Sequence, residues 1–173
     1  GYFCLKGKPM NVSANSLLDI AGYEEFNILK EVLNLEEEKI YSTPESRKSL
    51  KYKQVILTTD ADTDGMHIQG LCINWFHRRW PALLECGFVQ ILVTPVIRTF
   101  PSDKKLSSLR FYDEADFAAW HSSSEGKVFK GRIKYYKGLG SSKDEDIKAD
   151  IKTAPTVTCV YDPEASNSLE LAF

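Results

Sequence analysis

The clearest pattern of apolar and polar positions lies between residues 54 and 97. An unbroken, β-branched run at Val55–Thr59 is typical of a strand buried on both faces of a parallel sheet. Apolar residues then recur at helical spacing from Ile68 to Phe76. A second apolar run, Phe88–Val93, predicts another strand, so this segment predicts a right-handed strand–helix–strand unit.

The N-terminal region predicts two helices followed by a loop. One helical region begins near Ser13, with Ser13 or Asn15 as its cap, and Gly22 interrupts it. A second helix from about Tyr23 gathers its apolar positions on one face, at Phe26, Leu29, Val32 and Leu33. Six acids between residues 24 and 38 are interpreted as a solvated helix face. Residues 41–53 are polar, contain a proline and predict a loop.

The second half of the chain is more polar. A short strand is expected at Phe111–Tyr112 and a short helix at Asp113–Trp120. Five bases and no acids lie between Lys127 and Lys137, followed by a Gly-rich turn at Gly138–Ser142. The basic stretch is typical of a solvated strand edge, where lysines discourage aggregation. It also fits a phosphate-contacting surface, with the backbone N–H groups of the turn available to an anion.

Composition narrows the class of protein. The 173 residues fit one domain, or one domain with attached elements, and 22 basic against 24 acidic residues give a net charge of −2. This balance argues against a histone-like protein and permits a local basic patch. No apolar run approaches the ~18 residues that a membrane span needs. The four cysteines show no CxxC spacing, which indicates reduced, mostly buried thiols rather than a zinc ribbon.

The sharpest chemical feature is the acidic sequence from Asp60 to Gly65, DADTDG. Each pair of carboxylates at ~4 Å and an effective dielectric of ~20 repels by about 4 kcal/mol, so the cluster needs a cation or basic neighbours. Mg²⁺ prefers such hard oxygen ligands. Because ligands bind at the carboxyl ends of strands in open α/β sheets, we expect Asp60 and Asp62 to be metal ligands. Asp64 is either a third ligand or the N-cap of the following helix.

Two other interpretations of this loop compete with the magnesium site. The string matches the first half of a calcium-binding EF-hand loop, but position twelve is Leu71 instead of the required Glu, and a strand precedes it. A capped polar turn without metal is the simpler alternative, since Asp and Gly are turn residues. His67 follows the loop closely, which raises its chance of touching a phosphate.

At this point the residues show a family resemblance. The stretch from Ile56 to Glu85 resembles the toprim domain of type IIA DNA topoisomerases. Three further segments are similar in family order: Leu5–Val12 resembles PLRGK-x-LNV, Thr94–Ile97 the end of a central strand, and Tyr135–Ser141 the motif YYKGLGT. Leu169–Phe173 resembles the LAF that follows in the family. The ordered set spans nearly the whole chain and is much more specific than the acidic motif alone.

The resemblance implies an α/β, Rossmann-like toprim fold, with a parallel sheet and helices on both faces. It assigns residues 1–173 to a toprim domain fragment. Within it, residues 1–12 are a DNA-contact segment, 54–97 the strand–helix–strand core with the acidic metal loop, and 127–142 the basic strand and Gly turn. The family's metal ligands fall on Asp60 and Asp62, and its third motif Asp falls on Asp64, so all three are expected at the metal. The DNA-contacting Lys and Asn of the family fall on Lys8 and Asn11. His67, beside the acidic loop, and Lys137, in the basic stretch, are also expected to bind DNA.

The implied function is the metal-binding part of an ATP-dependent type II DNA topoisomerase, an isomerase that cleaves and religates duplex DNA for strand passage. The cofactor is Mg²⁺, and ATP is used by a domain absent from this chain. The implied partners are double-stranded DNA, the remainder of the topoisomerase chain and a second copy in a homodimer, without a membrane. A nucleus is the expected location; a viral cytoplasmic factory or an organelle are the alternatives.

The chain also departs from the family pattern. The motif EGDSA, which carries the family's catalytic Glu upstream of PLRGK, does not occur, and the chain begins at Gly1 as if cut from something longer. The nucleophilic tyrosine is expected beyond Phe173, and none of the eight tyrosines has its context. We therefore expect the fragment alone to be inactive. A toprim-type nuclease or primase module and a non-catalytic DNA-binding module are the rival functions.

Overall fold

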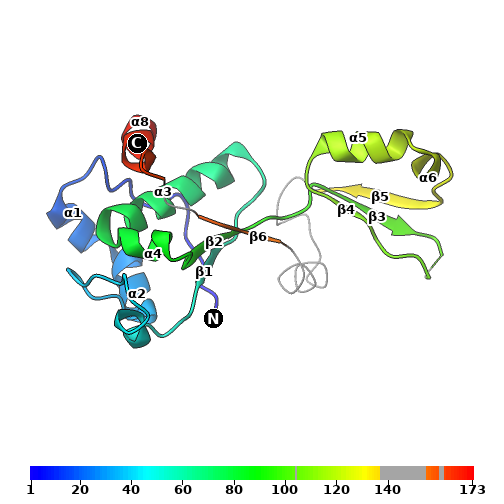
Figure 1. Cartoon of the computed structure of the whole chain (residues 1–173). Helices are drawn as coiled ribbons and strands as arrows, with labels where there is room; N and C mark the ends of the chain where they lie inside the picture. Colours follow the sequence, from blue (N-terminus) through cyan, green and yellow to red (C-terminus); the bar gives the residue numbers. More distant parts are fainter. Residues whose placement is uncertain (104, 137–154, 160–161) are drawn as a thin grey trace. The chain divides into compact units, whose positions relative to one another are not determined.

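The computed structural model describes residues 1–103, 105–136, 155–159 and 162–173. It divides into two compact units, each described by itself below (Figure 1). The first unit comprises Gly1–Leu57, Asp64–Ile91 and Thr156–Phe173, and the second comprises Thr58–Thr63 and Leu92–Pro155. In the part of the chain that is described, no helix is long and apolar enough to cross a membrane.

The first unit is built on a parallel strand pair. Strand β1 (Val55–Leu57) pairs in parallel with β2 (Val89–Leu92), with Val55 opposite Val89, and β6 (Thr156–Thr158) joins the other edge of β2. Helices α3 (Thr63–Arg79) and α4 (Pro81–Glu85) form the connection between β1 and β2. The predicted strand–helix–strand unit and the α/β class are thereby confirmed. The remaining elements of this unit are α1 (Leu17–Gly22), α2 (Glu24–Leu33), the 3₁₀ turn η1 (Ser46–Ser49) and α8 (Ala165–Ala172).

Helix α1 begins later than the sequence pattern predicts. Its N-cap is Ser16, whose hydroxyl accepts from the backbone N–H of Asp19 while the Asp19 carboxylate accepts from the N–H of Ser16. This reciprocal capping box satisfies two of the N–H groups that a helix start leaves unpaired. The two expected caps are engaged elsewhere: Asn15 donates to the carbonyl of Asn11, and the Ser13 hydroxyl accepts from Asn74.

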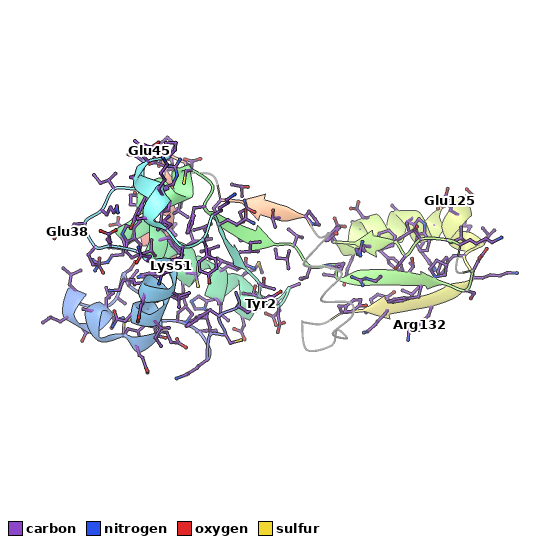
Figure 2. All side chains as sticks on the ribbon, turned by 90° about the horizontal axis from the view of Figure 1, so that it is seen from below. Tyr2, Glu38, Glu45, Lys51, Glu125 and Arg132 are labelled. Carbon is purple, nitrogen blue, oxygen red and sulfur yellow. The ribbon has the colours of Figure 1, made fainter. Side chains whose placement is uncertain are left out.

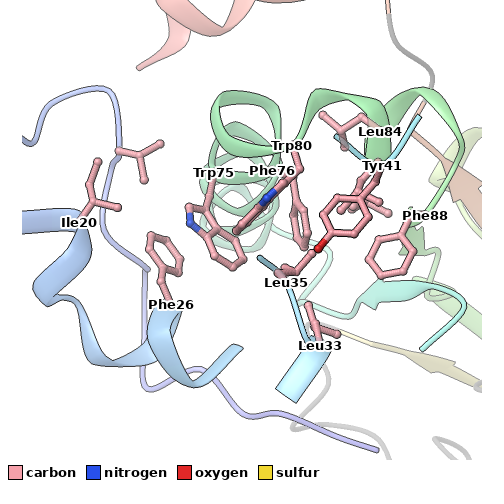
Figure 3. Packing of buried hydrophobic residues seen from close by; sticks show 13 residues of the cluster. Ile20, Phe26, Leu33, Leu35, Tyr41, Trp75, Phe76, Trp80, Leu84 and Phe88 are labelled. Carbon is pink, nitrogen blue, oxygen red and sulfur yellow. The ribbon is translucent and has the colours of Figure 1, made fainter. Parts of the chain in front are cut away.

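The core of the first unit is a cluster of aromatic side chains between α2, α3 and the loop before η1 (Figure 3). The rings of Phe26 and Trp75 are stacked, with centroids 4.4 Å apart and planes 7° apart, and Trp80 meets Trp75 edge-on. Two polar atoms in the cluster find backbone partners. The Trp80 indole N–H donates to the carbonyl of Glu36, and the Tyr41 hydroxyl accepts from the N–H of Glu36. The cluster is therefore apolar, and the polar atoms of Trp80 and Tyr41 within it are hydrogen-bonded.

The cysteines are all thiols, but only some are buried. Cys72 is buried in α3, and burial raises its pKa to about 12. Cys159 is half-buried, whereas Cys4 and Cys86 are exposed, so the prediction of mostly buried thiols is wrong for these two.

The second unit contains an antiparallel sheet that the apolar pattern does not predict in full. Strand β3 (Ile97–Pro101) lies between β4 (Arg110–Phe111) and β5 (Gly131–Tyr135) and pairs antiparallel with both. Helix α5 (Glu114–Ser122) confirms the expected short helix, and α6 (Ser124–Lys127) replaces an expected loop. Strand β3 escapes the pattern because two polar residues separate its apolar Ile97 and Phe100, so it shows neither an apolar run nor strict alternation.

We predict that replacing Phe26 by Ala lowers the free energy of unfolding by about 3–5 kcal/mol, because the ring is buried and its loss opens a cavity against Trp75. Urea denaturation followed by tryptophan fluorescence measures the change. The control is Leu18→Ala, at a side chain that is 85% exposed, which should change stability by no more than about 0.5 kcal/mol. Equal effects of the two substitutions would contradict the assigned core.

Candidate metal and nucleic-acid site

The acidic loop follows strand β1 directly. Asp60 is half-buried and Asp62 is exposed, and both lie on Thr58–Thr63, the short segment of the second unit that comes after β1. Both residues make contacts within the protein. Two carboxylates separated by one residue fit Mg²⁺, which typically takes one or two protein carboxylates and completes its shell with waters and phosphate oxygens. Asp60 and Asp62 would hold the ion in such a site.

Asp64 belongs to the first unit and is already engaged by a base. Helix α3 begins at Thr63, so Asp64 lies in its first turn and is not its N-cap. Its carboxylate is 2.7 Å from the ammonium of Lys8, which lowers the Asp64 pKa through a hydrogen bond and through its charge. Both side chains are exposed, so the ion pair adds little to stability. The contact nevertheless brings the Lys6–Lys8 turn to the start of the helix that follows the acidic loop.

A buried carboxylate holds the Lys6–Lys8 turn in place. Glu25, in the first turn of α2, accepts a 3.0 Å hydrogen bond from the backbone N–H of Lys6 and a second bond from the Tyr23 hydroxyl. These bonds lower the Glu25 pKa, that from Tyr23 most, whereas burial and the bond to Glu25 raise the Tyr23 pKa to about 12. The turn and these side chains line a shallow surface depression of about 450 Å³.

Sequence reasoning missed Glu25. The sequence pattern predicts that Glu25 is solvated like the other acids of residues 24–38, yet it is only 9% exposed, whereas neighbouring Glu24 is exposed. A usable signal was its position immediately before Phe26, the residue that opens the apolar face of the helix. Side chains next to the apolar face are at the edge of the core and are often partly covered.

Asn11 lies in an internal hydrogen-bond network. Its amide N–H donates to the carbonyl of Phe173 at 3.0 Å, and its side-chain oxygen accepts from the N–H of Ser13 at 2.9 Å. Asn74, which is fully buried in α3, donates to the Ser13 hydroxyl at 2.8 Å and reaches the Asn11 oxygen at 3.5 Å. The predicted DNA contact therefore also ties the N-terminal segment to α3 and to Phe173.

His67 and Phe173 are stacked on the surface of α3. The ring centroids are 5.9 Å apart with an interplanar angle of 26°. Phe173 packs so closely on Gly70 that a β-carbon there would lie 2.7 Å from the ring. Because residues three apart share a helix face, His67 lies on the same side of α3 as Asp64.

The structure thus brings Lys8, Asp64, His67 and Asn11 together within the first unit. Lys137 and the Gly138–Ser142 turn lie outside the described residues. Over residues 1–103, 105–136, 155–159 and 162–173, no three His, Cys, Asp or Glu side chains gather as a metal-binding cluster. The metal-ligand roles of Asp60, Asp62 and Asp64 accordingly stay predictions.

We predict that Glu25 makes the stability of the chain fall in acid. Its folded-state pKa is lower than its unfolded value of about 4.3, so its contribution is present at higher pH and is lost as the pH falls through the folded-state pKa. The measurement is the urea midpoint between about pH 6 and pH 3. In Glu25→Gln, which retains an acceptor but does not titrate, this fall should be smaller, whereas Glu24→Gln should behave like the parent chain. Identical pH profiles for all three would contradict the prediction.

Comparisons with known proteins agree with the resemblance seen in the sequence. Residues 2–94 match the model of the Toprim domain, and residues 92–173 match that of the C-terminal associated domain of TOPRIM. The two matches meet at residues 92–94, close to Leu92, where the second unit's longer segment starts.

Eukaryotic DNA topoisomerases are among the relatives. DNA topoisomerase 2-beta of Gallus gallus is 38% identical over the whole chain, and DNA topoisomerase 2-alpha of Homo sapiens is 35% identical. The chain spans 11% of the length of each. The crystal structure of the Plasmodium falciparum topoisomerase II DNA-binding, cleavage and re-ligation domain superposes with a TM-score of 0.80 at 31% identity, over 98% of this chain and 23% of that one. The chain therefore belongs to the Toprim family, as a Toprim domain followed by its C-terminal associated domain.

Proposed function

We propose that this chain is the metal-binding toprim part of an ATP-dependent type II DNA topoisomerase, which cleaves and religates duplex DNA for strand passage. The observation that carries the proposal is the 2.7 Å contact between Lys8 and Asp64. It joins two motifs far apart in the sequence, the basic turn and the acidic loop. The likeness to topoisomerase 2 relatives along the whole chain supports the same assignment.

In the proposed function each predicted site residue has a role. Asp60 and Asp62 hold Mg²⁺, with Asp64 as a third ligand or as the partner of Lys8. The ion supplies charge stabilisation at the phosphate and the leaving oxygen. Lys8 and His67 supply cationic or hydrogen-bonding groups to DNA phosphates. Asn11 keeps a second amide N–H, beyond the one given to Phe173, and Lys137 adds a further base.

The remaining partners follow from the same proposal. Double-stranded DNA is the substrate, and the parent enzyme is a nuclear homodimer whose ATP is used by a domain other than this one. Residues 1–12, 54–97 and 127–142 are the proposed DNA-contact segment, metal-loop core and basic strand with its turn. Because cleavage also needs the Glu of EGDSA and a nucleophilic Tyr, which this sequence does not supply, we expect the chain by itself to be inactive.

We predict that Mn²⁺, a paramagnetic substitute for Mg²⁺, binds at the acidic loop. Titration of the ¹⁵N-labelled chain should broaden the amide signals of residues 60–65 in a saturable way. The broadening should disappear in Asp60→Asn/Asp62→Asn and persist in Asp116→Asn/Glu125→Gln, which removes two exposed acids of the same unit. Broadening that is uniform, or that survives in the first variant, would exclude the proposed ligands.

We predict that Asp60→Asn in the full-length protein lowers DNA cleavage and supercoil relaxation by about 100-fold, since lost charge stabilisation of several kcal/mol costs roughly a factor of ten per 1.4 kcal/mol. Gel assays of cleavage, religation and relaxation measure the change, with Asp116→Asn as the control. Unchanged activity would favour a non-catalytic DNA-binding module. Metal-dependent nicking without religation, or primer synthesis, would favour the nuclease or primase alternatives.

A further inference from the structure

Helix α2 carries more apolar side chains than the core of the first unit takes up. Phe26 and Leu33 are buried in the aromatic cluster, and Leu29 packs against it. Ile28 and Val32, by contrast, are 40% and 37% exposed, so the prediction that Val32 belongs to the core face is corrected here. Because residues four apart share one face of a helix, Ile28 and Val32 form an apolar surface of their own.

Helix α1 adds two further apolar side chains at the surface. Leu17 and Leu18 are 69% and 85% exposed, whereas Ile20 belongs to the core cluster (Figure 3). At about 100° per residue, Leu18 lies roughly on the opposite side of the helix from Ile20. The side-chain amide of Asn27 donates to the carbonyl of Ala21 at 2.7 Å, which holds the first turn of α2 against the end of α1. Each helix therefore turns one side to the shared core and presents apolar side chains to solvent.

The charged side chains beside this apolar surface are carboxylates. Glu24 lies four positions before Ile28 and Glu31 three positions after it, so both exposed acids share its side of α2. None of the ion pairs among the described residues includes Glu24 or Glu31. Two bases of this region are engaged by other groups. Lys30 forms an ion pair with an acid beyond the helix, and Lys51, labelled in Figure 2, donates to the backbone carbonyl of Glu31 at 3.0 Å.

Together these side chains form what we call the outer face of α1 and α2: Leu17, Leu18, Glu24, Ile28, Glu31 and Val32. In Figure 2, α1 and α2 (blue) lie at the margin of the first unit, and their side chains extend beyond the ribbon. Single hydrophobic residues at a surface need no explanation. Four of them on two adjoining helices, with acids beside them, are typical of a surface that binds a partner.

Charge and size determine which partner the outer face suits. A second copy of the chain would place acids against acids across a two-fold axis, and a nucleic acid would bring phosphates to the same carboxylates. Carboxylates instead attract Lys and Arg side chains. Four apolar side chains are too few for the large apolar interface of a permanent association, whereas they match the anchors of a single amphipathic helix. A helix that is apolar on one side and basic beside it meets both conditions.

We propose that the outer face binds a cationic amphipathic helix of a separate protein. The apolar side of that helix packs on the exposed leucine, isoleucine and valine side chains of α1 and α2, and Lys or Arg residues beside it pair with Glu24 and Glu31. The inference does not depend on the proposed DNA chemistry, because it uses none of the residues assigned to metal or to DNA. It gives a protein partner to a region that has no role in the proposed function.

The test is a titration of the ¹⁵N-labelled chain with a designed peptide of about 16 residues, which carries leucines along one side of a helix and lysines along the other. A peptide of the same composition in scrambled order, without an apolar side, is the control ligand. Saturable shifts of amide signals should be centred on residues 17–32 and give the affinity. Circular dichroism of the bound peptide should show that it is helical.

Two pairs of substitutions test the two kinds of contact. Leu18→Ser/Ile28→Ser removes one apolar side chain from each helix, and its matched control, Leu106→Ser/Val128→Ser, removes two exposed apolar side chains of the second unit. Glu24→Gln/Glu31→Gln removes the two charges, with Asp116→Asn/Glu125→Gln as its control. Urea unfolding establishes that each variant is folded, and Leu18→Ala/Ile28→Ala serves if the serine pair is not.

We expect about a tenfold loss of affinity when the two apolar side chains are removed, against less than about twofold for their control. Removal of the two acids should lower the affinity about fivefold at low salt and weaken its dependence on salt concentration. Equal losses in a pair and its control would overturn the proposal, since general hydrophobicity or net charge would then explain the binding. Equal affinity for the scrambled peptide would overturn it for the same reason.

Two further measurements separate the proposed partner from other occupants. Anisotropy of the fluorescein-labelled peptide with the full-length protein should give the same affinity, and its loss would overturn the proposal, because the rest of that protein would then cover the outer face. Self-association of the chain that Leu18→Ser/Ile28→Ser abolishes, measured by analytical ultracentrifugation, would assign the outer face to a second copy instead. Asp60→Asn/Asp62→Asn should bind the peptide like the unaltered chain, so a failure of the proposed function would leave this result in place.

Discussion

The packing of α2 against α3 through Phe26 and Trp75 sets the geometry on which the candidate site depends. Glu25 precedes Phe26 on α2 and accepts a hydrogen bond from the backbone N–H of Lys6, while α3 starts within the acidic sequence Asp60–Gly65. Burying one aromatic pair therefore helps to fix the distance between the Lys6–Lys8 turn and Asp64 in the first turn of α3. The geometry of a polar site at the surface is thus fixed by an apolar contact in the core beneath it.

The candidate site combines a buried carboxylate with an exposed ion pair, and the two differ in their electrostatics. Glu25 is buried, and its carboxylate is satisfied by two donors within the protein, which makes it a structural anchor. Asp64 and Lys8 form an exposed pair in which neither charge has paid a large desolvation cost. Either member of such a pair can move to another charged partner at a small cost in free energy. Lys8 and Asp64, which we assign to phosphate and metal, can thus change partners. Glu25, which positions the Lys6–Lys8 turn, keeps its two hydrogen-bond donors.

Whether the sequence predicts a feature depends on whether the interactions behind that feature are local or long-range in the sequence. Strands β1 and β2 and the helix between them follow from apolar runs, and the placement of His67 beside Asp64 follows from helical spacing. The cap of α1 was misplaced because Ser13, Asn15 and Ser16 have similar local signals, and only contacts with Asn74 and Asn11 separate them. The burial of Glu25 and the pairing of β3 with β4 and β5 depend on tertiary packing and strand register, which no window of sequence contains. The metal ligands stay predictions, and Lys137 lies outside the described residues.

The contact between Asn11 and Phe173 joins residues 162 positions apart, and β6 likewise returns to the edge of β2. Closing such long loops carries an entropic cost that must be met before the contact stabilises anything. During synthesis on the ribosome, Asn11 is made 162 residues before Phe173, so this hydrogen bond cannot form until the segment around Phe173 has been made. The order of translation therefore delays the final placement of Asn11 until the C-terminal segment of the first unit has been synthesised.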